Sequence, residues 1–87
     1  MALRVERVGT KDLAVLRVSG RIDAEGVETL RELLQQEEGK VAIDLSQVTL
    51  INREAIRFLA LSEANGVELR NCADYIDEWI ARERRRK

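Results

Sequence analysis

One segment of the chain, residues 40–61, constrains the fold more than any other part. It begins with a short apolar run at residues 41–45, broken only by Asp44, which is typical of a strand that helices cover in a parallel sheet. We expect a loop over residues 46–51 and then a helix over about residues 52–63. The segment therefore predicts the strand–loop–helix unit of a layered α/β domain.

The helix after this loop has a clear start signal. Asn52 is suited to cap it, because an asparagine side-chain oxygen accepts hydrogen bonds from backbone N–H groups two or three residues later. Glu54 falls in the first turn, where negative charge is favourable at the positive end of the helix dipole. In an open α/β sheet, a loop at the carboxyl end of a strand is where ligands and partners meet the fold. We therefore expect the functional surface at this loop.

The remaining residues complete a single domain that spans residues 1–87. Further strands are expected at residues 3–7, 13–19 and 67–70, and further helices at residues 24–37 and 73–84. A turn at residues 9–12 joins the first two strands into a hairpin, and Asp23 is suited to cap the first helix. The order is ββαβαβα, which implies a small mixed α/β sheet with three parallel strands and one N-terminal hairpin strand. The right-handed crossover rule places the first two helices on one face of this sheet.

The chain lacks the residues on which most enzyme sites are built. Histidine, the commonest general base and transition-metal ligand, is absent, and Cys72 is the only cysteine. No phosphate-binding glycine loop and no nucleophile elbow occurs. Asp23 and Asp44 fall near one sheet edge and could bind Mg²⁺, but a capping role and a loop role explain them better. We expect a non-enzymatic protein with no catalytic, cofactor-binding or metal-binding residues.

Charge is unevenly distributed along the chain, although the net charge is only −1. Residues 82–87 carry five basic side chains and one acidic one, while the rest carries 10 basic and 15 acidic side chains. This pattern lacks the continuous basic patch of a nucleic-acid-binding protein, and the tail is typical of a solvated helix end. No apolar run is long enough to span a membrane, and the first residues lack the apolar core of a secretory signal. We expect a cytoplasmic protein.

Several apolar side chains have two readings. Phe58 widens the inward stripe of the helix at residues 52–63, and the pattern favours a place in the core over a contact surface. Tyr75 and Trp79, one turn apart in the last helix, suit a domain rim or an interface. Cys72 is expected to be a small buried hydrophobe and not a reactive thiol.

Two segments resemble the STAS domain, which is the fold of bacterial anti-sigma factor antagonists and of sulfate-transporter tails. They are residues 15–25, VLRVSGRIDAE, and residues 41–61, VAIDLSQVTLINREAIRFLAL. The shared signals are a glycine followed by Ile-Asp before the first helix, then Asp-Leu-Ser and a valine, and then the loop into the next helix. The resemblance covers nearly the whole chain.

The resemblance also implies where a regulatory switch would lie. In the family, the loop into this helix reads Asp-Ser-Ser-Gly or Asp-Ser/Thr-x-Gly, and its first hydroxyl is phosphorylated by a partner kinase that is also an anti-sigma factor. Here Asn52 matches the aspartate, Arg53 the phosphorylated residue, Glu54 its neighbour and Ala55 the glycine. Arginine cannot accept a phosphate as serine does, so the resemblance implies a surface that is constitutive and not switchable.

We therefore expect a protein-interaction module that resembles an anti-sigma factor antagonist, lacks the phosphorylatable residue, and acts as a constitutive regulator or scaffold. The alternative is a STAS-like subunit of an ABC-type membrane transport assembly. The candidate partners are an anti-sigma factor or kinase-like regulator, an ATPase subunit, and a second copy of the chain. The predicted partner-binding residues are Arg21, Asp23, Asn52, Arg53, Glu54, Ile56 and Arg57. Ser46, Thr49 and Ser62 are the hydroxyls that could take over as a modification site.

Overall fold

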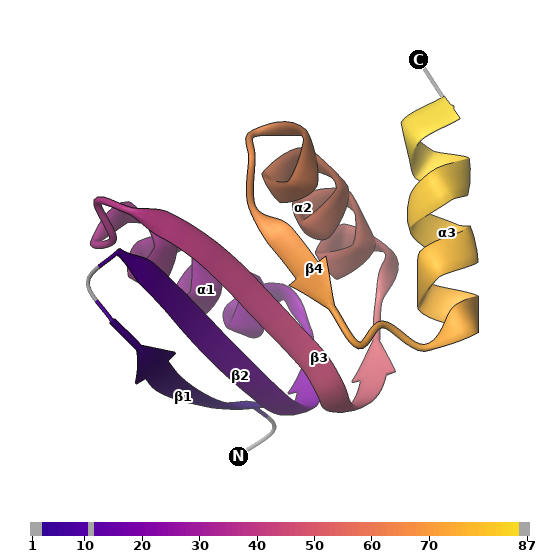
Figure 1. The fold of residues 1–87 in the computed structure, drawn as a ribbon. Coiled ribbons are helices and arrows are strands. Elements are labelled where there is room, and N and C mark those ends of the chain that lie inside the picture. The colour runs from indigo at the N-terminus through magenta and orange to yellow at the C-terminus, as the bar shows by residue number, and fades with distance from the viewer. Residues whose placement is uncertain (1–2, 11, 86–87) are drawn as a thin grey trace.

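A computed structural model describes residues 3–10 and 12–85 and shows the predicted order of elements (Figure 1). The elements are β1 (Leu3–Gly9), β2 (Leu13–Ile22), α1 (Ala24–Gln35), β3 (Lys40–Ile51), α2 (Arg53–Ala64), β4 (Glu68–Arg70) and α3 (Asp74–Arg85). The predicted order ββαβαβα is therefore confirmed. The last two residues of the basic tail, 86 and 87, lie outside the described residues.

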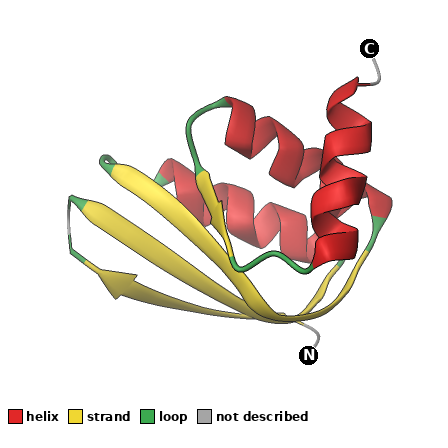
Figure 2. Cartoon of the chain, turned by 45° about the vertical axis from the view of Figure 1, so that its right-hand side comes forward, coloured by secondary structure: helices red, strands yellow, loops and turns green. Residues whose placement is uncertain are grey.

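The strands form one mixed sheet in the order β1-β2-β3-β4. β1 is antiparallel to β2, whereas β2, β3 and β4 run parallel to one another. Both crossover helices, α1 and α2, lie on the same face of the sheet, and α3 packs against α2 (Figure 2). The predicted mixed sheet, with its hairpin strand and its helices on one face, is confirmed.

The core lies between this sheet and the helices. In β2 the side chains of Ala14, Leu16 and Val18 are buried, while the residues between them are more exposed, as the two-residue period of a strand requires. The opposite face of the sheet is not covered by a helix in the described part of the chain (Figure 2). The main buried cluster comprises Val18, Ile22, Val27, Leu30, Ile43, Leu45, Ile51, Ala55, Ile56, Phe58, Leu59, Ala60, Ile76 and Ile80.

The two central strands are longer than the sequence predicted. Residues 46–51 were predicted as a loop, but β3 continues through them and pairs with the end of β2, where Ile22 lies opposite Ile51. The hydroxyl of Thr49 also donates to the carbonyl oxygen of Gly20, at 3.2 Å. The register shifts along this stretch, as in a β-bulge, and Gly20 has a φ of +91° that favours glycine. The polar residues of this segment had suggested that its backbone N–H and C=O groups were solvated. The predicted loop is wrong because pairing with β2 satisfies these groups instead.

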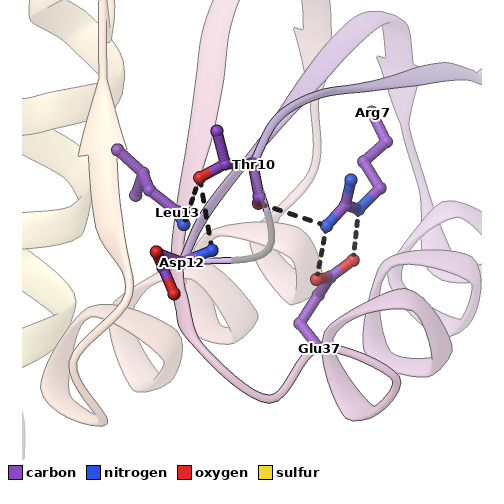
Figure 3. Close-up of polar contacts among 5 residues, drawn as sticks. All are labelled: Arg7, Thr10, Asp12, Leu13 and Glu37. Carbon is purple, nitrogen blue, oxygen red and sulfur yellow. Dashed lines mark hydrogen bonds and ion pairs between the residues drawn. The ribbon is translucent and has the colours of Figure 1, made fainter.

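The far end of the hairpin is fixed by polar contacts (Figure 3). The hydroxyl of Thr10 accepts from the backbone N–H groups of Asp12 and Leu13, each at 3.2 Å. The guanidinium of Arg7 donates to both carboxylate oxygens of Glu37, at 2.7 and 3.1 Å, and ties β1 to the segment after α1. The predicted turn at residues 9–12 falls at this end of the hairpin, remote from the α2 start, and residue 11 lies outside the described residues.

Candidate partner-binding surface

The carboxyl ends of β2 and β3 lie together and lead into the two crossover helices. The backbone N–H of Asn52 donates to the carbonyl oxygen of Ile22, at 3.3 Å, and links the two strand ends. Asp23 accepts from the N–H of Gly26 at 3.0 Å, and Asn52 accepts from the N–H of Ala55 at 2.9 Å. Both predicted N-caps are confirmed, and they start α1 and α2 at the same edge of the sheet.

The predicted partner-binding residues gather at this edge, with one exception. Arg21 lies near the end of β2, Asp23 is half-buried in its capping contact, and the remaining residues lie at or just after the start of α2. The exposed members are Arg21, Asn52, Arg53, Glu54 and Arg57. Ile56 has 0% exposure and belongs to the core. Its assignment to the surface is wrong, because its helical position places it on the same inward side as Leu59.

An acidic side chain from α3 also reaches this edge. One carboxylate oxygen of Glu83 lies 3.4 Å from Nε of Arg53, and the other lies 3.6 Å from Nε of Arg57. The Glu83 side chain is only 10% exposed, whereas the two arginine side chains are 50% and 61% exposed. The sequence shows the two arginines one helical turn apart, but it gives no local signal that α3 packs across α2.

Two apolar side chains at this end of the molecule are exposed to solvent. Leu50, near the end of β3, is 55% exposed, and Tyr75, in the first turn of α3, is 53% exposed. Both views place the start of α3 beside the end of β3 (Figures 1 and 2). Leu50 pairs with the exposed Arg21 across the two strands, and an exposed leucine beside a charged side chain is a feature of many contact surfaces. Leu50 was missed because it fell in the predicted loop.

A second exposed apolar surface lies between α1 and α2. Phe58 is 8% exposed and belongs to the core, as the sequence favoured, and the Arg31 guanidinium lies 5.8 Å from its ring centre. Leu61 beside it is 65% exposed. With Leu34 and Val67 these residues line a shallow groove of about 480 Å³. The groove includes none of the predicted partner-binding residues.

The acidic residues and the cysteine have local structural roles. Asp44 accepts from the N–H of Ser46 at 2.9 Å, and this hydrogen bond is the main reason that the pKa of Asp44 is lowered. Cys72 is half-buried, and burial, with a smaller contribution from Asp77, raises its pKa to about 11. The thiol is therefore a poor nucleophile near neutral pH. Within residues 3–10 and 12–85, no three of Cys, Asp and Glu are grouped as a metal site would require.

The three hydroxyls considered as modification sites differ in exposure. Ser46 and Thr49 are exposed, and Thr49 makes its hydrogen bond to Gly20 across the strand pair. Ser62 is 7% exposed and lies in α2. Of the three, only Ser46 and Thr49 lie where an enzyme could reach them without opening the fold.

Across the described ranges 3–10 and 12–85, no helix combines the length and the apolar composition needed to cross a bilayer.

Comparison with known proteins gives a family match and structural matches, two of which are described here. A family model described as "Mlab, STAS domain" matches residues 6–73. An antisigma-factor antagonist STAS domain from Rhodobacter sphaeroides is 19% identical, with a TM-score of 0.59 over 84% of this chain and 94% of that one. The anti-sigma factor antagonist SpoIIAA in its unphosphorylated form is 15% identical, with a TM-score of 0.69 over 94% of this chain and 80% of that one. No curated protein sequence matches significantly.

Proposed function

Because this chain belongs to the STAS domain family, we propose that it is a non-enzymatic regulatory module that binds another protein through the edge described above. We call this edge the α2-start surface and define it by Arg21, Leu50, Arg53, Glu54 and Arg57. The observation that carries the proposal is the exposure of Leu50, at 55%, at the carboxyl ends of two parallel strands, where it pairs with the exposed Arg21 and precedes the exposed Arg53 by three residues in the chain. Such edges are where open α/β sheets bind their ligands and partners.

We propose further that this surface is constitutive. A phosphate at the start of a helix brings about −1.5 to −2 charges and changes which partners that surface accepts. Arg53 is the first residue of α2 and is half exposed, and it stands where the family resemblance places the phosphorylated hydroxyl. A guanidinium has no hydroxyl for a serine or threonine kinase to phosphorylate, so this position lacks the phosphorylated state. Phosphorylation at this position therefore does not switch the surface.

The partner that we propose is an anti-sigma factor or a kinase-like regulator of that type. Support for this choice comes from the two structural neighbours, which are described as anti-sigma factor antagonists. The charged residues that make up the rest of the α2-start surface also support a partner that binds reversibly, because a surface meant for permanent association is usually more apolar. A partner that is an ABC-type ATPase subunit would indicate the transport-assembly alternative instead.

The test is affinity capture from the native cell with the full chain as bait. Leu50→Arg places a charge on the one apolar member of the α2-start surface, and Leu61→Arg makes the same change on a leucine that is similarly exposed, at 65%, in the α1–α2 groove. The proposal expects mass spectrometry to identify a sigma-regulating protein that is retained by the wild type and by Leu61→Arg, and lost from Leu50→Arg. Loss from Leu61→Arg alone would place the interface in the groove and overturn the proposal.

The captured partner can also be used to test whether the surface is constitutive. The captured partner is incubated with ATP and the chain, and the chain is then analysed by peptide mass spectrometry. The proposal expects no phosphate on residues 52–55 and unchanged retention by the partner. A phosphate on Ser46 or Thr49 that releases the partner would show that the surface is switchable, and would contradict this part of the proposal.

A further inference from the structure

We propose that Arg53 and Arg57 form a clamp for a carboxylate, which Glu83 of the chain's own α3 occupies in the free protein and an acidic side chain of a protein partner occupies in the complex. This inference rests on the proposed function and specifies the chemistry of the partner at the α2-start surface. The carboxylate of Glu83 indicates the chemistry of the partner, because it shows which kind of group the two guanidiniums bind. Its two oxygens each contact a different arginine.

The contacts that Glu83 makes with the two arginines are long. They measure 3.4 and 3.6 Å, which is longer than the ~2.7–2.9 Å of a well-formed charge-assisted hydrogen bond. The protein makes shorter contacts of this kind elsewhere, since the Arg7 guanidinium donates to both carboxylate oxygens of Glu37, at 2.7 and 3.1 Å. A partner carboxylate that reached this better geometry would therefore compete well with Glu83.

The two arginines are also accessible to solvent, and together with Glu83 they carry a net positive charge. The two arginine side chains are 50% and 61% exposed, so a partner reaches them from solvent, while the Glu83 side chain lies beneath them at 10% exposure. Two guanidiniums on one carboxylate carry a net charge of about +1 between them, and each guanidinium has five N–H donors. The contacts described above use only the Nε donors of Arg53 and Arg57. An acidic group is the complementary partner for this arrangement.

The position of Glu83 in α3 allows it to leave without unfolding the domain. α3 is anchored on the core by the buried side chains of Ile76 and Ile80, and Glu83 lies nearly one turn beyond them. The last turn of a helix opens more readily than its anchored part. Such an opening would also break the neighbouring ion pair between Arg84 and Glu63, whose atoms lie 3.1 Å apart. Release of Glu83 from the two arginines therefore involves a movement of the last turn of α3.

The probe for this clamp is a peptide of six glutamates, with a peptide of six glutamines as the uncharged control. Binding is followed by NMR through the side-chain Nε–Hε signals of Arg53 and Arg57 in the full chain. We expect the glutamate peptide alone to move both signals. Glu83→Gln should lower the Kd of this peptide about two- to fivefold, the size of effect that partly exposed ion pairs have. Glu78→Gln, an exposed residue on the same helix, removes the same charge and should leave the Kd nearly unchanged.

Three results would overturn the clamp. They are movement of neither arginine signal, a weaker or unchanged affinity in Glu83→Gln, and an equal gain in Glu78→Gln. If Glu83→Gln does not fold, the side-chain carboxyl ¹³C signal of Glu83 in the wild type decides, since the clamp requires it to move when the peptide binds. If the clamp fails while Leu50→Arg still abolishes partner capture, the proposed function stands and only this inference falls.

Discussion

Replacing Asn52 by alanine removes one acceptor from the start of α2 and leaves the backbone unchanged. The side-chain oxygen of Asn52 accepts from the N–H of Ala55 at 2.9 Å, and alanine has no oxygen to replace it. The φ and ψ of Asn52, −103° and 176°, lie in the extended region that alanine adopts without strain. The backbone hydrogen bond from Asn52 to Ile22 is kept. The substitution therefore isolates the capping interaction on which the α2-start surface is built.

The expected loss is about 1 kcal/mol in the free energy of unfolding, within the ~0.5–2 kcal/mol found for N-cap substitutions. We place it in the middle of this range because the freed N–H group belongs to Ala55, which is 0% exposed, while removal of the exposed Asn52 side chain lets water approach it. For a domain of 87 residues, this loss corresponds to a decrease in Tm of roughly 4–8 °C. The first turn of α2, which carries Arg53 and Arg57, should also fray more often.

Urea unfolding followed by circular dichroism measures this loss, and an unchanged m-value would show that the unfolded state is not affected. Asn65→Ala is the matched control at the other end of α2. The capping contacts of Asn65 come from its backbone N–H, which lies 3.1 Å from the carbonyl oxygens of Leu61 and Ser62, and alanine keeps them. The control should lose less than about 0.5 kcal/mol. A loss in the control equal to that in Asn52→Ala, or no loss in either, would refute the capping argument.

Three further changes test the burial and the electrostatics described above. Ile56→Ala should lower the free energy of unfolding in urea by about 2–5 kcal/mol, since Ile56 is 0% exposed. The neighbouring exposed change Arg57→Ala should lower it by less than about 1 kcal/mol. Similar losses in the two variants would contradict the assignment of Ile56 to the core. The hydrogen bond from the Ser46 N–H lowers the pKa of Asp44 below its ordinary value of 3.8. The ionised Asp44 therefore stabilises the fold at neutral pH, and this stabilisation is lost as the pH falls from about 3.8 through the lower pKa of the folded state. Asp44→Asn should therefore lose less stability than the wild type between pH 7 and pH ~3 in urea unfolding, and an identical loss would refute this. Because burial raises the pKa of Cys72 from 9.0 to about 11, iodoacetamide should label the native thiol at pH ~8 about a hundredfold more slowly than the urea-unfolded one, and equal rates would show that the thiol is exposed.

The caps and the order of elements were predictable because their signals are local. Asp23 and Asn52 each precede an amphipathic run, and the capping bond closes within three residues of the cap. The order ββαβαβα then limits the sheet, because parallel neighbours need right-handed crossovers. The position of the α2-start surface follows from this topology, since two parallel strands must end at one edge.

The features that were not predicted depend on contacts between distant residues. The extension of β3 to Ile51 needs the pairing with β2, and a polar stretch such as residues 46–49 carries no sign of this pairing. The contact of Glu83 with Arg53 needs α3 to cross α2, which no local pattern specifies. Ile56 is a different case, because its inward position was visible in the helical period and the surface assignment ignored it.

Hydrogen–deuterium exchange of the full chain, alone and with its captured partner, tests most directly where the chain binds. The α2-start surface predicts that the partner slows exchange at residues 20–23 and 49–57, where the strand ends and the first turn of α2 lie. Exchange at residues 31–35, beside the α1–α2 groove, should not change. Slower exchange at residues 31–35, with none at 49–57, would contradict the account.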